Sequence, residues 1–221
     1  RPNFSESEAV QRAIYLASLS DARVHIFHMT TRESCQIVEE WRSQGYPVAA
    51  ETCPQFLVLT ADVYKRRNGH LYATCPPLRT EDDCAYLWGG LEKGVVQVAA
   101  TDHCSVTRKQ KDRWKGDFRK IPCGLPGVET LLPLLFTEGL MTGRITSTTL
   151  VECLCSNPAK IFGLYPRKGA IQIGSDADIL IIDPGRETKV IARNLHMKSD
   201  YSPYDGMALR GFPEITMLRG K

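Results

Sequence analysis

The first hundred residues alternate between two hydrophobic patterns. In one, apolar positions recur every three or four residues, the period of an amphipathic helix, and in the other a short run of apolar residues suggests a buried strand. The helical pattern predicts helices over residues 6–19, 32–43 and 81–93, and the apolar runs predict strands over 24–28, 48–52 and 95–101. Strands that alternate with helices predict a parallel sheet covered on both faces, hence an α/β fold. Ser5, with Glu8 three residues later, matches a capping box for the first helix.

The second half of the chain has a different texture. A long polar segment, 105–120, and a run rich in Gly and Pro, 121–127, follow the third strand, and segments of this length inside a compact domain are usually functional. Helices are expected over 128–138, 147–155 and 157–162, and short alternating runs typical of antiparallel strands over 170–173, 177–183 and 214–218. We therefore place a domain boundary near Pro166, which divides residues 1–166 from 167–221.

Composition and charge narrow the class of protein. The 221 residues include 28 Lys and Arg against 25 Asp and Glu, a net charge of +3, which favours neither a nucleic-acid surface nor an anionic membrane. No apolar stretch approaches the roughly 20 residues that span a bilayer, and the chain starts without a signal-peptide core. We expect a cytoplasmic protein with reduced cysteines, whose partner is a small molecule or another copy. The first residue is Arg, which fits a piece of a longer polypeptide.

Polar residues stand directly after each predicted strand, where ligands gather in parallel α/β proteins. They are His28, Glu51 with Thr52, and Asp102 with His103. His25 precedes His28 by three positions, so on a strand the two point to opposite faces, and the terminal His28 is the better candidate. Imidazole nitrogen and carboxylate oxygen suit Zn²⁺. A buried histidine satisfied by backbone groups would give the same pattern, so both interpretations stay open.

Two loops that contain proline are the next candidates. Thr74–Arg79 holds an extended backbone around two prolines, and Ile121–Gly124 ends in a glycine that allows close approach of a ligand. Either loop could present fixed main-chain groups to a ligand, and either could be a rigid structural turn. The basic cluster 108–115 is expected to be a solvated loop or the cover of a pocket.

Several motifs, in order along the whole chain, closely resemble the D-hydantoinase/dihydropyrimidinase family of cyclic amidohydrolases. They are residues 50–55 (AETCPQ), 75–79 (CPPLR), 101–104 (TDHC), 116–122 (GDFRKIP), 157–169 (NPAKIFGLYPRKG) and 174–179 (GSDADI). The resemblance implies the carboxyl-terminal part of a (β/α)8 barrel, here residues 1–166, and of a small β-sandwich, here residues 167–221. It also implies ring opening of dihydropyrimidines or 5-substituted hydantoins, and a homo-oligomer, a tetramer in the family.

The family carries a binuclear zinc site. By motif, His28 matches the ligand at the end of the sixth barrel strand and Asp102 the ligand at the end of the eighth, where Asp102 would also act as general base. The resemblance further implies that main-chain atoms of Cys75, before the two prolines, and of Cys123, before the glycine, grip the cyclic imide. Serine and asparagine are common at these two positions in the family, and cysteine could reshape the pocket.

The remaining family ligands have no match in this chain. It holds no His-x-His pair, no candidate carboxylated lysine after an early strand, and no additional histidine at a strand end before His28. A barrel of this type takes about 250 residues by itself, so about half of the fold is expected to lie outside the chain. We therefore expect the isolated chain to be inactive.

Two rival interpretations accompany this hypothesis. One is a non-catalytic scaffold like the collapsin-response mediator proteins, which share the fold without the metal site; His28 and Asp102 argue against it. The other is a neighbouring amidohydrolase such as an allantoinase or a dihydroorotase, although the runs 121–127 and 166–169 resemble hydantoinases more.

Overall fold

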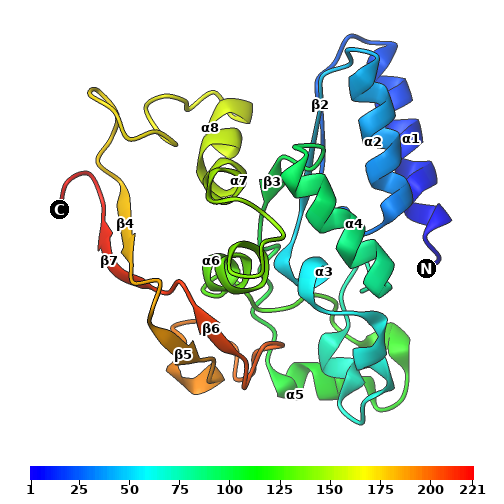
Figure 1. Ribbon diagram of the computed structural model, residues 1–221. Coiled ribbons are helices and arrows are strands. Elements are labelled where there is room, and N and C mark those ends of the chain that lie inside the picture. The colour runs from blue at the N-terminus through cyan, green and yellow to red at the C-terminus, as the bar shows by residue number, and fades with distance from the viewer.

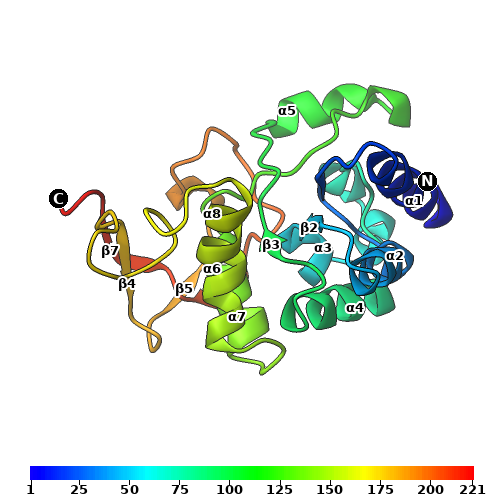
Figure 2. The same cartoon turned by 90° about the horizontal axis from the view of Figure 1, so that it is seen from above.

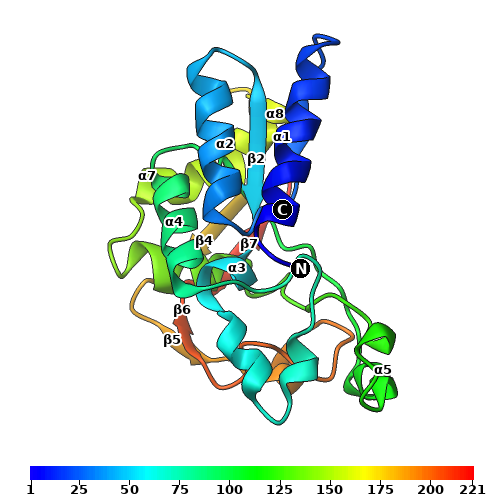
Figure 3. The same ribbon diagram turned by 90° about the vertical axis from the view of Figure 1, so that its right-hand side faces the viewer.

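The computed structural model describes all residues, 1–221, and confirms the α/β class. Strands β1 (Val24–Ile26), β2 (Val48–Thr52) and β3 (Val98–Ala99) form one parallel sheet in the order β1-β2-β3. The register pairs Val24 with Val48 and Glu51 with Val98. Helices α1 (Phe4–Ser18), α2 (Arg32–Ser43) and α4 (Glu81–Glu92) lie on one side of the strands in Figures 1 and 2, and in Figure 3, seen from that side, β2 appears between α1 and α2. All three predicted strands exist; β2 has the predicted bounds, whereas β1 and β3 are shorter than their apolar runs.

The segments after β3 form a second helical layer, next to β3 in Figure 1. Its members are α6 (Leu131–Leu134), α7 (Ser147–Val151) and α8 (Asn157–Ile161), with α6 and α7 continued by π-helical turns over Leu135–Leu140 and Glu152–Ser156. The short helices α3 (Pro54–Val58) and α5 (Arg108–Lys111) follow β2 and β3. In Figure 2, α5 stands apart from the other helices. None of the helices is both long and apolar enough to cross a bilayer.

Two antiparallel pairs complete the fold at the end of the molecule opposite the N-terminus (Figures 1 and 2). Strand β4 (Ile179–Ile182) pairs with β7 (Pro213–Met217), and β5 (Glu187–Lys189) pairs with β6 (Ala208–Arg210). The predicted strands over 177–183 and 214–218 are thus confirmed.

The strand predicted over 170–173 is wrong. That segment is a loop with no partner strand, closed where the Asp176 amide donates to the Arg167 carbonyl at 2.9 Å. An ion pair between the Lys168 ammonium and the Asp176 carboxylate, 2.8 Å apart, also joins the two ends of this loop. Its apolar residues Ile171 and Ile173 are exposed, which is why the alternating pattern misled the prediction.

The start of the first helix also differs from the prediction. Helix α1 begins at Phe4, so Ser5 lies inside its first turn and its hydroxyl donates to the Pro2 carbonyl at 2.7 Å instead of capping. The carboxylate of Glu6 reaches away from its own helix to the amino end of α2.

Side chains of β2 alternate between the two faces of the sheet. Val48, Ala50 and Thr52 are buried on the face covered by helices, where a core cluster includes Val38 of α2 and Leu87 of α4. The intervening Ala49 and Glu51 are half-buried. A second, smaller core joins the α6 helix to the β5–β6 pair through Leu134, Val190, Tyr204 and Leu209. The β5–β6 pair therefore has a small core of its own, whereas Ile182 of β4 packs against the larger cluster.

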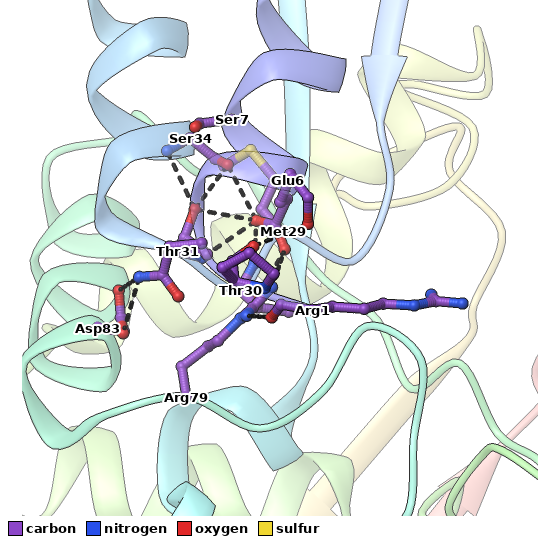
Figure 4. Close-up of polar contacts among 12 residues, drawn as sticks. Arg1, Glu6, Ser7, Met29, Thr30, Thr31, Ser34, Arg79 and Asp83 are labelled. Atoms are coloured by element: carbon purple, nitrogen blue, oxygen red, sulfur yellow. Dashed lines mark hydrogen bonds and ion pairs between the residues drawn. The ribbon is translucent and has the colours of Figure 1, made fainter. Parts of the chain in front are cut away.

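The best-connected polar group in the fold is the Glu6 carboxylate (Figure 4). It accepts hydrogen bonds from the Thr30 amide at 2.8 Å and the Thr31 amide at 3.1 Å, and from the Ser34 hydroxyl at 2.9 Å. The Arg79 guanidinium lies 3.4 Å away, and both side chains of this pair are largely buried. Since amides at a helix amino end lack partners within the helix, a carboxylate there satisfies them and interacts favourably with the helix dipole. Glu6 therefore joins α1, α2 and the Arg79 loop.

Replacing Glu6 with alanine should lower the free energy of unfolding by about 3 kcal/mol, because the buried Thr30 and Thr31 amides and the Arg79 guanidinium lose their acceptor. Urea denaturation measures the change. The control is Glu8→Ala, which removes an exposed carboxylate paired with Arg12 on the same helix and should change the stability far less. Equal losses in the two variants would contradict this role of Glu6.

The thiol of Cys35 makes the fold sensitive to alkali. Burial, with a smaller contribution from the Glu6 and Asp83 carboxylates, raises its pKa from the ordinary 9.0 to about 12. Because the folded chain keeps a proton that the unfolded chain releases, this stabilisation is complete below pH 9.0 and is lost as the pH rises toward about 12. Cys35→Ala should reduce the alkaline loss of stability by about 1.4 kcal/mol per pH unit in that window.

Denaturation at about pH 8, 9 and 10 tests this dependence. Val38→Ala, at a buried apolar position on the same helix, is the control. It should lower the stability at every pH by the same amount. An unchanged pH slope in Cys35→Ala would show that the thiol does not cause the effect.

Candidate functional site

The carboxyl ends of the three parallel strands meet at one edge of the sheet, where β2 holds its two neighbours. The Met29 amide, just after β1, donates to the Glu51 carbonyl at 2.8 Å, and the Thr52 hydroxyl donates to the Met29 carbonyl at 2.8 Å. On the other side, the Ala100 amide donates to the Thr52 carbonyl at 2.9 Å. The segments that carry His28 and Asp102 are therefore fastened to the same strand end.

His28 and Asp102 share an unusual backbone conformation. Both have a left-handed φ, 40° at His28 and 43° at Asp102, which only a few per cent of residues other than glycine adopt. Such strain persists where the surrounding structure fixes the residue, and it often marks functional positions. Because β1 ends at Ile26, the strand alternation that set His25 and His28 on opposite faces does not extend to His28. The turn, rather than the strand, sets the direction of its side chain.

His25 and Glu51, the other polar residues of these strands, are paired with each other. The His25 Nε2 atom lies 3.2 Å from the Glu51 carboxylate, without the geometry of a hydrogen bond, and both side chains are largely buried. The His25 ring also packs against Phe27 and Phe162, with centroid distances of 5.0 and 5.8 Å. Glu51 therefore faces His25 rather than the chain beyond the strand end.

The donors at the strand ends agree in kind with a metal site. His28 offers imidazole nitrogen, and its Nδ1 atom is buried without a hydrogen-bond partner, while the Asp102 carboxylate is exposed. These are donor types that Zn²⁺ accepts. Within the 221 residues, however, no three His, Cys, Asp or Glu side chains gather closely enough to hold an ion. The 221 residues by themselves therefore bring together no complete set of ligands for an ion.

The two predicted loops lie against each other. The Gly124 amide donates to the Ala73 carbonyl at 3.1 Å, which joins the loop that contains Cys123 to the loop that contains Cys75. Gly124 is required here, because it has a φ of 121° and a Cβ atom would lie 2.5 Å from the Cys104 Cβ. Cys123 is exposed and Cys75 is half-buried beside the Arg1 guanidinium.

His103 connects Asp102 to the second loop. Its Nδ1 atom accepts hydrogen bonds from the Gly127 amide at 3.1 Å and the Val128 amide at 3.2 Å. An imidazole nitrogen that accepts amide hydrogens is the acceptor of the ring, which leaves Nε2 as the atom that can donate. Next in the chain, the Cys104 amide donates to the Leu125 carbonyl at 3.0 Å. The backbone after Asp102 is therefore fixed against residues 125–128.

Arg79 makes the corresponding connection on the other side. Its Nε atom donates to the Thr30 hydroxyl at 2.9 Å and its Nη1 atom to the Arg1 carbonyl at 2.6 Å, both shown in Figure 4. These bonds tie the end of the first loop to the turn that follows His28.

Sequence reasoning missed the burial of Lys111. The basic cluster 108–115 is expected to be a solvated loop or the cover of a pocket, but the Lys111 side chain is completely buried. It is also the last residue of α5, whose other three residues are exposed. Its position at the end of a single helical turn inside a polar segment gave no signal of burial, since no apolar period marks it.

The comparisons with known proteins agree on one family. Residues 23–221 match the amidohydrolase family. The D-hydantoinase of Rhizobium radiobacter is 41% identical over 224 residues, which cover 100% of this chain and 49% of the relative. The D-phenylhydantoinase of Escherichia coli (strain K12 / DH10B) is 40% identical over 223 residues, with coverages of 100% and 48%. The chain spans about half the length of the curated relatives it matches.

Solved structures give the same result for the backbone. The dihydropyrimidinase from Brevibacillus agri NCHU1002 superposes with a TM-score of 0.97 at 37% identity, over 100% of this chain and 48% of that one. A D-hydantoinase from Bacillus sp. AR9 gives a TM-score of 0.97 at 38% identity, with coverages of 100% and 49%. Since the family match runs over residues 23–221 and these proteins share sequence and backbone with the whole chain, the chain belongs to the amidohydrolase family.

Proposed function

We propose that this chain is the carboxyl-terminal portion of a zinc-dependent hydrolase that opens the cyclic amide of dihydropyrimidines or 5-substituted hydantoins. The observation that carries the proposal is the similarity of the entire chain, in sequence and backbone, to proteins named hydantoinase and dihydropyrimidinase. The presence of His28 after β1 and Asp102 after β3, on either side of the end of β2, supports a catalytic protein over a scaffold without metal.

In this proposal His28 and Asp102 are two ligands of a zinc pair, and the other ligands come from sequence outside this chain. When bound, zinc would lower the pKa of a bound water and polarise the carbonyl of the ring. The Asp102 carboxylate would accept a proton from the attacking water and return it to the ring nitrogen as that nitrogen leaves. Its exposure at the end of β3 leaves its oxygens free for both tasks.

Main-chain atoms at Cys75 and Cys123 would hold the cyclic imide. A ring with alternating carbonyl and N–H groups needs donors and acceptors in fixed positions, and backbone groups in two mutually hydrogen-bonded loops supply them. The two cysteine side chains would then affect which ring substituent is accepted more than they affect the binding of the ring by main-chain atoms.

The parallel sheet also suits a larger barrel. Strand β1 pairs only with β2, and so does β3, so each has a second edge without a partner strand. Unpaired edges are unfavourable in a finished fold. We propose that further barrel strands cover both edges, that residues 1–166 form the barrel portion and that residues 167–221 belong to a small sandwich. The assembly would be a homo-oligomer, a tetramer as the family resemblance implies.

The longest polypeptide that the gene encodes should open dihydrouracil or a 5-substituted hydantoin when supplied with zinc. His28→Ala and Asp102→Ala should each reduce kcat/KM by about a thousandfold or more. Each substitution removes a proposed metal ligand, and Asp102→Ala also removes the proposed general base. Asp82→Ala, at an exposed carboxylate on the first turn of α4, is the control and should keep full activity. Loss of ring opening confined to the two site variants supports the proposal, and activity that survives in both contradicts it.

The chain of residues 1–221 alone should not open either ring, with or without zinc, because two donors cannot hold a zinc pair. The same assay measures this, and equilibrium dialysis with zinc measures the binding directly. Sustained, zinc-dependent turnover by the isolated chain, abolished in Asp102→Ala, would overturn the expected division of the ligands.

A further inference from the structure

Lys111 is a buried cation without a carboxylate partner. It is the one lysine whose side chain is completely buried, and the lysines that pair with carboxylates are Lys65, Lys120 and Lys168. Burying an unpaired ammonium is costly unless polar groups replace its water. Burial lowers the pKa of Lys111 to about 8, and the nearby thiols of Cys123 and Cys104 oppose that shift only in part. A lysine kept here at such a cost points to a task other than packing.

The groups that replace the water are two main-chain carbonyls. The Lys111 ammonium donates to the Ala73 carbonyl at 2.7 Å and to the Gly124 carbonyl at 2.9 Å. Ala73 stands two residues before Cys75, and Gly124 directly follows Cys123. Apart from the bond between the Gly124 amide and the Ala73 carbonyl, Lys111 supplies the direct link between the two loops that the proposed function assigns to the substrate.

The helix that carries Lys111 is anchored independently of it. The Arg108 amide donates to the Asp200 carboxylate at 2.7 Å, and the Ser199 hydroxyl donates to the Val106 carbonyl at 2.8 Å. On the far side, the His70 imidazole lies 2.8 Å from the Asp112 carboxylate. With α5 held at both ends, the ammonium is a fixed point against which the loops are positioned.

We propose that Lys111 is a positioning residue of this site, whose ammonium sets the separation of the Cys75 and Cys123 loops and thereby the fit of the cyclic substrate. This inference rests on the proposed function. Lys111 acts through the two carbonyls and touches no reacting atom. An apolar side chain of similar length would fill the same space but leave the Gly124 carbonyl without a donor and the Ala73 carbonyl with the Gly124 amide alone, so the loops would move apart or admit water.

The test compares Lys111→Met, Lys111→Arg and the control Lys109→Met, an exposed lysine on the same helix turn, in the longest polypeptide that the gene encodes. For ring opening, Lys111→Met should raise KM by about tenfold or more and change kcat by less than about threefold, because the loops bind the ground state and the transition state alike. Lys111→Arg keeps the charge and the donors and should recover part of the loss. Lys109→Met should leave both constants unchanged.

Hydrogen exchange at the Gly124 amide gives a readout that does not depend on activity. Lys111→Met should speed its exchange by about tenfold or more, while amides of β2 keep their rates. Unchanged KM and unchanged Gly124 exchange in a folded Lys111→Met protein would overturn the proposal. If that variant does not fold, the same exchange measurement in Lys111→Gln decides, since its shorter side chain cannot reach both carbonyls. A wild-type protein without ring opening would refute the proposed function alone, because the exchange result still stands.

Discussion

The buried carboxylate of Glu6 is the interaction on which the arrangement of this edge of the sheet depends. It fills the amino end of α2 and meets the Arg79 guanidinium, and Arg79 in turn holds the Thr30 hydroxyl and the Arg1 carbonyl. A single side chain thus fixes the turn after His28 and the end of the loop that contains Cys75. Because the carboxylate and the guanidinium are both largely buried, water competes little with these bonds, and the geometry is set by the fold.

The same kind of connection continues around the candidate site. The first loop runs from Arg79 back to Ala73, whose carbonyl accepts hydrogen bonds from the Lys111 ammonium and the Gly124 amide. The second loop continues from Gly124 to residues 125–128, where the Gly127 amide donates to His103, the neighbour of Asp102. The positions of His28 and Asp102 and of the two loops between them are therefore coupled through hydrogen bonds. A change at one connection is expected to reach the others, since groups in one hydrogen-bond network do not act independently.

The sequence was sufficient for the parts that depend on periodicity and order. Apolar runs located all three parallel strands, and residues that follow a strand located His28 and Asp102, because the carboxyl ends of parallel strands share an edge. It was insufficient for contacts over long separations. Glu6 and Lys111 look like ordinary surface charges in their own segments, and their burial depends on groups at Thr30 and Ala73 that no local pattern connects to them. The strand prediction over 170–173 also failed because of a contact that no local pattern shows: an alternating pattern forms a strand only where a partner strand exists.

The charges of the site divide by exposure, and the division matches their tasks. Arg79 and Lys111 are buried and the Glu6 side chain is largely buried, so water competes little with their hydrogen bonds. Asp102 is exposed at the strand end, and the His28 Nδ1 atom is buried with no partner in this chain. Groups that must hold the backbone are thus satisfied internally, whereas groups proposed to bind metal keep their capacity for partners outside the chain. A protein in which the metal donors were satisfied internally would gain local stability and lose the proposed chemistry, so the unsatisfied donors at this edge favour a catalytic half over a scaffold.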